Sequence, residues 1–277
     1  MRSWKTHKEL IKESGEYSKE NFVVEDVQFS IKNAPKGEHV NQTQLTSLDK
    51  HVPSILDFFG IKKNKAPIGV VPIYTGNLAH AVRKAGKGPV IGMDLNAAWV
   101  SRMNKGLILS KTGEDIQVKP IRSFITDMQK PQFNDTKFSA LVSFEPTPLL
   151  ASLNRAVLPN LGASGGFILI TKKGGSFDVD HPKSWGSISD TRFLKEYGVQ
   201  VRTKIWGRGK EKIESTQFII PKKNKNKYLF DRECFESVEN KGESAEEVAK
   251  RLHASKADVL MARNRYKMMG YNFIKLK

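Results

Sequence analysis

The chain has 277 residues, of which 39% are hydrophobic and 27% are charged, and this composition is typical of a globular protein rather than a disordered one. The single cysteine, Cys234, excludes an intramolecular disulfide framework and a cysteine-rich metal site, and no apolar run is long enough to span a membrane. The N-terminal residues MRSWKTHKEL contain no apolar signal region, so we expect a soluble cytoplasmic or nuclear protein that is not secreted.

The formal net charge of +17 arises from 46 Lys and Arg against 29 Asp and Glu. A basic surface of this size favours a polyanionic partner through the release of counterions. We therefore expect the partner to be nucleic acid, and RNA rather than DNA. We expect no membrane partner, and the protein would act either alone or as part of a larger assembly. Membrane phosphate, an acidic protein and a merely basic composition are the alternatives. The candidate nucleic-acid-binding residues are Lys62, Lys63, Lys65, Lys173, Arg208, Lys210, Lys222, Lys223, Arg263, Arg265 and Lys267.

Residues 1–65 are polar and are expected to form an N-terminal helical extension. The segment FVVEDVQFSI alternates enough for a short strand. The segment TSLDKHVPSILDFFG predicts a helix that Thr46 or Ser47 caps and that ends at Gly60.

Residues 66–221 alternate apolar strand-like runs with helical ones. The predicted strands are 68–74, 89–95, 116–121, 139–144, 166–172, 199–206 and 215–221. Helices are predicted at 77–86, 97–105, 147–158 and 189–197, with a short turn near 123–130. This alternation indicates an α/β domain with a doubly wound, mainly parallel sheet whose ligands bind at the carboxyl ends of the strands. The last two strands are joined by the short segment GRGKEKIE and should form an antiparallel hairpin.

Residues 222–277 form a third unit, in which a basic linker precedes two helices. Ser244 with Glu247, and Ser255 with Asp258, have the spacing of capping boxes. The stretch is similar to a helix-turn-helix motif, with His253 at the turn position that glycine usually occupies. The alternative is an ordinary helical hairpin packed on the main domain.

Two positions near the start of the sheet domain have the chemistry of a nucleotide site. Asp94 ends the second predicted strand, where a carboxylate can accept both hydroxyls of a ribose. The alternative is that Asp94 caps the helix that begins near Asn96. Gly76 and Asn77 follow the first strand, where glycine permits positive φ and close approach of a ligand.

Other chemistries lack their motifs in this sequence. The six histidines show no paired metal-ligand spacing, so no metal site is expected. The motifs GxxxxGK[ST] and GxGxxG are absent, which argues against a P-loop nucleotidase and a dinucleotide-dependent dehydrogenase.

Five segments between 66 and 221 resemble, in order and spacing, the class I S-adenosylmethionine-dependent methyltransferases. They are IGVVPIYTGNLA, VIGMDLNAAWV, SFITDM, DTKFSALVSFEPTP and LNRAVLPNLGASGGFILITK. The resemblance implies a seven-stranded Rossmann-like sheet, here with helical N- and C-terminal additions, and S-adenosylmethionine as cofactor. The implied cofactor-binding residues are Tyr74, Gly76, Asn77, Asp94, Asp127 and Ser143.

The sequence departs from the family pattern in the first loop. Val70 stands where the family has an acid, and Pro72 and Tyr74 stand where it has its first two glycines. Because proline fixes φ and has no N–H, the loop should bind the cofactor differently, more weakly or not at all.

Ribose 2′-O-methyltransferases resemble one another in a Lys-Asp-Lys-Glu set, and this likeness supplies the catalytic candidates Lys172, Glu145 and Glu214. Phe144 stands where the family has aspartate. Isolated charges usually face solvent, so the alternative for each is a surface residue. The resemblance thus implies a methyltransferase acting on nucleic acid, with RNA and its 2′-hydroxyl as expected targets. The alternatives are a catalytically inactive scaffold of the same fold that binds RNA or DNA, and a DNA-binding factor.

Overall fold

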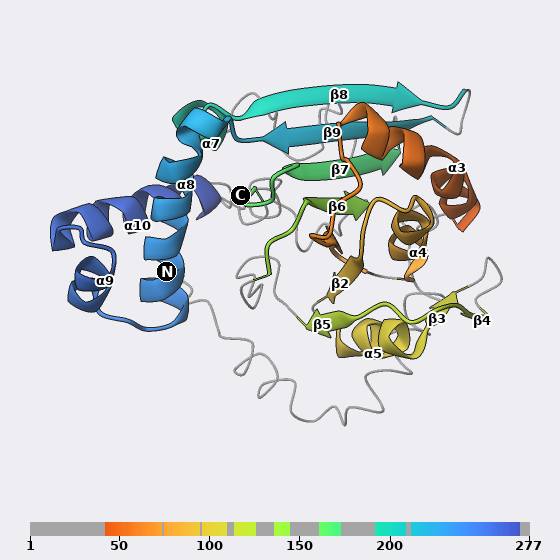
Figure 1. Ribbon diagram of the computed structural model, residues 1–277, viewed down its shortest axis with the longest axis horizontal. Helices are drawn as coiled ribbons and strands as arrows, with labels where there is room; N and C mark the ends of the chain where they lie inside the picture. The colour runs from red at the N-terminus through yellow and green to blue at the C-terminus, as the bar shows by residue number, and fades with distance from the viewer. Residues whose placement is uncertain are drawn as a thin grey trace, which may run out of the picture.

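The computed structural model describes residues 42–73, 75–94, 96–109, 114–125, 136–144, 161–172, 192–208 and 212–271 (Figure 1). Its centre is a seven-stranded sheet in the order β5-β2-β1-β6-β7-β9-β8. The strands are β1 (Ile68–Val70), β2 (Val90–Asp94), β5 (Ser123–Ile125), β6 (Ala140–Phe144), β7 (Phe167–Lys172), β8 (Gln200–Trp206) and β9 (Ile213–Ile219). A separate two-stranded sheet pairs β3 (Leu107–Leu109) with β4 (Asp115–Gln117).

The strands β5, β2, β1, β6 and β7 are parallel, whereas β9 is antiparallel to both β7 and β8. Every residue of β1, β2 and β6 is buried, which is why these segments read as continuous apolar runs. The order and directions confirm the doubly wound seven-stranded sheet expected from the resemblance. The pairing of β8 with β9 confirms the antiparallel hairpin.

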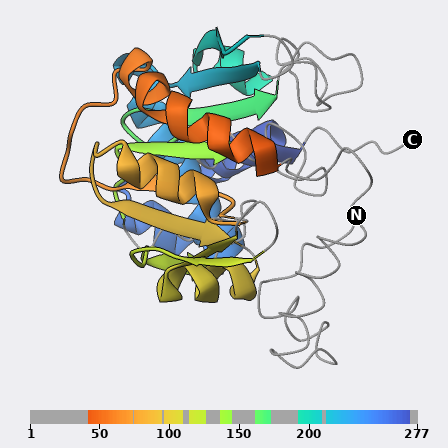
Figure 2. The ribbon, with the colours of Figure 1, turned by 90° about the vertical axis from the view of Figure 1, so that its right-hand side faces the viewer.

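The sheet lies between two layers of helices (Figure 2). The helices are α3 (Gln42–Phe58), α4 (Asn77–Lys84), α5 (Ala97–Lys105), α7 (Arg192–Glu196), α8 (Lys222–Phe235), a π-helical turn (Glu236–Asn240), α9 (Ala245–Arg251) and α10 (Lys256–Tyr271). The helices α3 and α4 cover one face, and their core includes Ile55 and Val82. On the other face, Tyr228 of α8 and Tyr266 of α10 join a second core that includes Phe167 and Phe218.

The third strand of the sheet differs from the prediction. A strand was expected at 116–121, but residues 115–117 pair with β3, and the sheet instead gains Ser123–Ile125, where a turn was expected. Pro120 explains the difference, because a residue without an N–H interrupts a ladder of backbone hydrogen bonds. Asn104 of α5 holds the start of β5, since its Oδ1 accepts from the N–H of Ser123 at 2.8 Å.

The N-terminal and C-terminal helices also refine the predictions. The helix α3 begins at Gln42, so Thr46 and Ser47 lie inside it rather than capping it, and its end before Gly60 (φ 72°) agrees with the prediction. Residues 222–227, predicted as a basic linker, form the first turns of α8. Because α3 packs into the core of the sheet domain, that core includes residues on both sides of position 65.

The two predicted C-terminal helices are present as α9 and α10. Ser244 Oγ accepts from the N–H of Glu247 at 3.2 Å, while Glu247 accepts from the N–H of Ser244 at 2.8 Å, which completes the first capping box. Ser255 and Asp258 exchange the corresponding bonds at the start of α10.

The expected strand at FVVEDVQFSI and the expected helix at 147–158 lie outside the described residues. Among the described residues, none of the helices has the length and apolar character needed to cross a membrane.

Candidate functional site

The candidate site lies at the carboxyl ends of β1, β2 and β6. The chain passes from β1 to β2 on one side, whereas β6 pairs with β1 on the other, so the strand order reverses between β1 and β6. In open α/β sheets, ligands bind at this point of reversal, outside the carboxyl ends of the strands.

Asp94 ends β2 at this edge and is only 5% exposed. Its Oδ2 accepts from the backbone N–H of Ile73 at 2.9 Å, and its Oδ1 accepts from the N–H of Asn96 at 2.9 Å. Asn96 in turn caps α5, because its Oδ1 accepts from the N–H of Ala98 at 2.8 Å. The carboxylate therefore holds the loops after β1 and β2 together at the position where the sequence suggested a ribose acceptor.

The loop between β1 and α4 packs inward. Pro72 follows a cis peptide bond and is buried, and Ile73 is 2% exposed. The side chain of Ile73 fills the space beside Gly92, since a Cβ built on that glycine would lie 2.9 Å from Ile73 Cδ1. Pro72 and Ile73 are thus part of the core of the protein.

Gly76 and Asn77 begin α4 in this loop. Gly76 has φ 84°, and a Cβ built on it would lie 2.3 Å from Met103 Sδ and 2.8 Å from Ile108 Cγ2. This position therefore requires glycine for both its backbone conformation and its packing. Asn77 Nδ2 donates to Thr75 Oγ1 at 2.9 Å and stabilises the turn that leads into α4.

Ser143 is the next-to-last residue of β6 and is fully buried. Its Oγ has no hydrogen-bond partner within the part of the chain that the structure describes. Because a buried hydroxyl without a partner is costly, this atom is a polar feature of the site that suggests a missing bond.

Two of the three catalytic candidates lie on described strands. Glu214 on β9 is 2% exposed, and its Cα partner on β7 is Thr171. The backbone of Lys172 is one residue further along β7, where its Cα partner is Ile213. The two candidates therefore lie on paired strands, one residue out of register. Glu145, Tyr74, Asp127, Lys173 and Lys210 lie outside the described residues.

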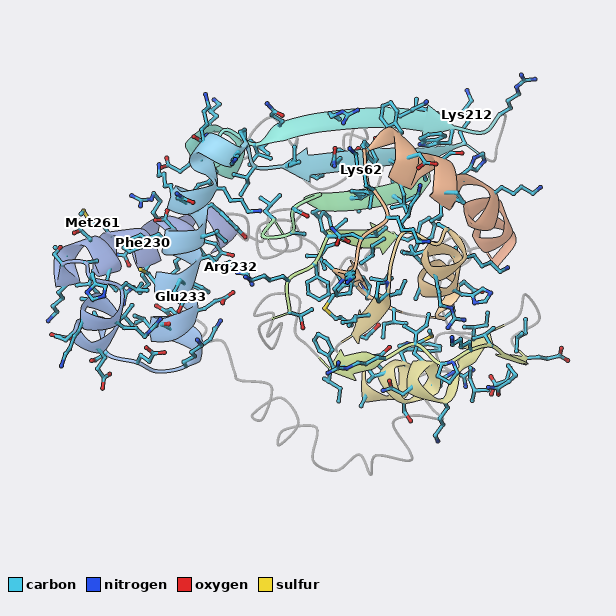
Figure 3. The ribbon with its side chains drawn as sticks, viewed as in Figure 1. Lys62, Lys212, Phe230, Arg232, Glu233 and Met261 are labelled. Carbon is cyan, nitrogen blue, oxygen red and sulfur yellow. The ribbon has the colours of Figure 1, made fainter. Side chains whose placement is uncertain are left out.

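The basic candidates divide into two groups. One group consists of exposed residues: Lys62, Lys63, Lys65, Arg208, Lys222 and Lys223. The other group lies on α10, where each residue has an acidic partner: Arg263 and Lys267 pair with Glu239, and Arg265 pairs with Asp231. Figure 3 shows Lys62 and Lys212 on the side of the molecule where α3 lies, and Phe230 and Met261 at the opposite end.

Arg265 is partly exposed, but it pairs with a buried carboxylate and is not an open cationic site. Its Nε donates to the fully buried carboxylate of Asp231 at 2.5 Å, and the hydroxyl of Tyr197 donates to the same carboxylate at 2.8 Å. Burial, together with the negative charge of Asp231, raises the pKa of the Tyr197 hydroxyl well above its usual range. These contacts attach α10 to α7 and α8.

The candidate nucleic-acid-binding residues do not include a group of basic and aromatic side chains that lies on α3 and β8. Arg202 and Lys204 lie against the rings of Phe58 and Trp206. The signal was present in part, because VRTKIW puts Arg202, Lys204 and Trp206 at alternate positions, which share one face of a strand. The contribution of α3, more than 140 residues away, could not be inferred.

The described residues contain no group of three or more His, Cys, Asp or Glu side chains that could hold a metal ion.

No protein-family model and no curated protein matches the chain. Solved structures with the same general architecture align with it at low identity. Magnesium protoporphyrin IX methyltransferase from Synechocystis PCC 6803, with bound S-adenosylmethionine, is 13% identical, with 78% of this chain and 99% of that chain covered and a TM-score of 0.45. A TehB-like methyltransferase from Corynebacterium glutamicum is 15% identical, with coverages of 73% and 98% and a TM-score of 0.39. The methyltransferase domain of bacterial CtHen1-C is 14% identical, with coverages of 64% and 98% and a TM-score of 0.41. At these values the likenesses carry no argument about activity or substrate.

Proposed function

We propose that the protein is an S-adenosylmethionine-dependent methyltransferase acting on nucleic acid, with RNA as substrate and the ribose 2′-hydroxyl as target. The observation that supports this most directly is the position of Asp94. In a sheet with the strand order and the antiparallel β9 of the class I methyltransferase fold, a carboxylate ends β2 beside the point where the strand order reverses. The net charge of +17 supports a polyanionic substrate.

The polar groups of the residues at the site are of the types that bind a nucleoside. Asp94 has carboxylate oxygens for ribose hydroxyls, which would have to share or displace the N–H donors of Ile73 and Asn96. The buried hydroxyl of Ser143 could bond with a polar group of the same ligand. When bound, S-adenosylmethionine supplies a methyl group on a positively charged sulfur.

A hydroxyl target must also lose its proton, which requires a base within reach. Glu214 and Lys172 are the candidates to accept and hold that proton, because they lie on the paired strands β9 and β7 at the carboxyl end of β7.

Methyl transfer to RNA tests this proposal. The wild-type protein is incubated with tritiated S-adenosylmethionine and total RNA, and the RNA is digested to locate the label. We expect label on ribose with the wild type and at least a tenfold loss with Lys172→Met or Glu214→Gln. Lys105→Met, on the exposed surface of α5, is the control and should keep full activity. Label on a base instead of ribose would contradict the 2′-hydroxyl target, and the absence of label in RNA, DNA and protein would contradict the enzyme.

One observation favours a second candidate, a scaffold of this fold that binds nucleic acid without a cofactor. The N–H of Ile73 already donates to Asp94, so the loop itself supplies a donor at the position where a ribose hydroxyl would donate. Nucleic-acid affinity that Asp94→Asn leaves unchanged, in a protein without methyl transfer, would favour the scaffold.

A further inference from the structure

Four side chains form a surface that we name the α3–β8 face: Phe58 on α3, and Arg202, Lys204 and Trp206 on β8. The three β8 residues occupy alternate positions of the edge strand, opposite Gln217, Ser215 and Ile213 of β9. Alternate positions point to the same face of a sheet, and this is the face that α3 covers. Arg202 and Lys204 are exposed, whereas Phe58 and Trp206 are partly exposed.

The two cations lie on the two rings. Lys204 Nζ is 4.5 Å from the centroid of the Phe58 ring and 4.4 Å from that of Trp206. The Arg202 guanidinium is 5.1 Å from the Phe58 centroid, and its NH2 group donates to the carbonyl oxygen of Phe58 at 3.1 Å. The rings cross at 84° with centroids 5.9 Å apart, and Trp206 Nε1 donates to Ser215 Oγ at 2.7 Å. Neighbouring contacts thus fix the rings, while the charged groups remain at the surface.

Ion pairs distinguish this face from several positions on the C-terminal helices. Among the described residues, no carboxylate lies within ion-pair distance of Arg202 or Lys204. Six cations of the C-terminal helices differ, because they pair with acids of the same unit: Arg232 with Glu236, Arg251 with Glu233 and Glu243, Lys256 with Glu246, Arg263 and Lys267 with Glu239, and Arg265 with Asp231. A phosphate must compete with these acids for the six paired cations, whereas Arg202 and Lys204 have no such competitor among the described residues.

The α3–β8 face also leads toward the candidate site. Trp206 pairs with Ile213 of β9, and Ile213 pairs with Lys172 of β7, so the three residues lie in one row across the sheet. Two strand spacings separate the backbones of Trp206 and Lys172 by roughly 10 Å. Because β8 is parallel to β7, a chain that follows β8 from Arg202 to Trp206 arrives at the carboxyl edge of the sheet.

We propose that the α3–β8 face binds single-stranded RNA, with Arg202 and Lys204 on phosphates and with Phe58 and Trp206 as stacking platforms for bases. Cationic grooves with interleaved aromatic rings bind single strands in this way, and stacking of a base is stronger than an exposed cation–π contact. A base can therefore displace Lys204 from the rings and leave its ammonium group for a phosphate. The inference rests on the proposed nucleic-acid substrate and identifies the surface that holds it.

Binding rather than methyl transfer tests this inference. The full chain is titrated into a fluorescent single-stranded RNA of about 12 nucleotides, which is within the length that one such surface covers, and anisotropy is recorded at several salt concentrations. The double variant Arg202→Glu/Lys204→Glu should bind at least 30-fold more weakly. The milder Arg202→Gln/Lys204→Gln variant should lower the salt dependence by about 1.4 in log–log slope, the value for two phosphate contacts on a single strand.

Lys105→Glu/Lys119→Glu is the matched control, because it makes the same change of charge with exposed residues near the opposite edge of the sheet. It should weaken binding less than threefold. Trp206→Leu should weaken binding about tenfold while leaving the salt slope unchanged, since stacking releases no counterions. Circular dichroism confirms that each variant is folded.

Equal loss of affinity in the charge-reversal variant and its control would overturn the inference, as would tighter binding of duplex than of single strands. Single-stranded DNA of the same sequence should bind through the same four residues. A wild-type protein that binds S-adenosylmethionine but no nucleic acid would overturn both this surface and the proposed substrate. Binding of RNA that all variants retain would overturn the surface alone.

Discussion

The backbone N–H of Ile73 lies 2.9 Å from Oδ2 of Asp94 and joins the loop after β1 to the end of β2. The carboxylate of Asp94, which would accept the hydroxyls of a ribose in the proposed site, therefore also accepts a hydrogen bond from within the protein. This relationship connects stability with cofactor binding, because any ligand of Asp94 must share or replace the N–H of Ile73.

Asp94→Ala should lower the free energy of unfolding by about 3 kcal/mol, because it leaves the N–H groups of Ile73 and Asn96 without their acceptor in a nearly closed site. Asp94→Asn should cost about half as much, since its amide oxygen can still accept one of the two bonds. Urea unfolding followed by circular dichroism measures both. A loss below about 0.5 kcal/mol in Asp94→Ala would mean that the bond to Ile73 does not hold the loop.

Arg265→Ala should destabilise the protein by about 3 kcal/mol, because it removes the cation that pairs with the buried carboxylate of Asp231 and leaves that charge with the neutral hydroxyl of Tyr197. Arg263→Ala, on the same helix, removes a longer pair with Glu239 and should cost at most about 0.5 kcal/mol. Thermal or urea unfolding compares the two variants. Equal and small losses would instead leave Arg265 available for a ligand.

His253→Gly should stabilise the C-terminal helices by about 1 kcal/mol, because His253 adopts a left-handed conformation (φ 52°) that costs a side chain free energy. The N–H of Ala254 donates to the carbonyl of Ala249 at 2.9 Å, and that of His253 to Lys250 at 3.4 Å, which is a Schellman ending for α9. Leu252→Gly is a useful contrast. Leu252 has an ordinary negative φ, so glycine brings no relief of strain there and the variant should be less stable than the wild type. Unchanged stability in His253→Gly would argue that the left-handed turn is not strained.

Cys234 should resist thiol reagents until the protein unfolds. Burial, followed by the negative charge of Asp231, raises the pKa of its thiol to about 11, so little thiolate forms at pH 8. The raised pKa contributes stability below the pKa of the unfolded thiol, near 8.5, and this contribution is lost as the pH rises toward about 11.

Two measurements check the behaviour of Cys234. Labelling with a chromogenic disulfide at pH 8 should be slow in buffer and fast in denaturant. The stability difference between the wild type and Cys234→Ala should shrink between pH 8 and pH 10.5. Rapid labelling of the folded protein would contradict the burial of the thiol.

The sequence predicted the sheet well because its central strands are buried on both faces and its turns are short. The hairpin of β8 and β9 followed from a run of turn residues between two apolar segments, and the capping boxes at Ser244 and Ser255 followed from local spacing. The third strand was misjudged because apolar residues on both sides of Pro120 read as one segment. A pattern of apolar residues does not predict the end of a strand where one residue without an N–H interrupts the backbone hydrogen bonds between strands.

The candidate site was less predictable, because its contacts join distant segments. Neither the bond between Ile73 and Asp94 nor the pairing of Arg265 with Asp231, 34 residues away, leaves a periodic signal in the sequence. The α3–β8 face was not predicted as one surface for the same reason, since Phe58 and Lys204 meet only when α3 packs on the edge of the sheet. The positions of Lys and Arg in the sequence could not show which of these side chains form ion pairs within the protein and which are available to a ligand.

The measurement that tests the central proposal most directly is isothermal titration of the folded protein with S-adenosylmethionine. We predict saturable heat with the wild type, at least tenfold weaker binding with Asp94→Asn, and unchanged binding with Arg263→Ala. No detectable heat at millimolar ligand, in a sample whose circular dichroism is that of the folded protein, would contradict cofactor binding and leave the scaffold as the function of this fold.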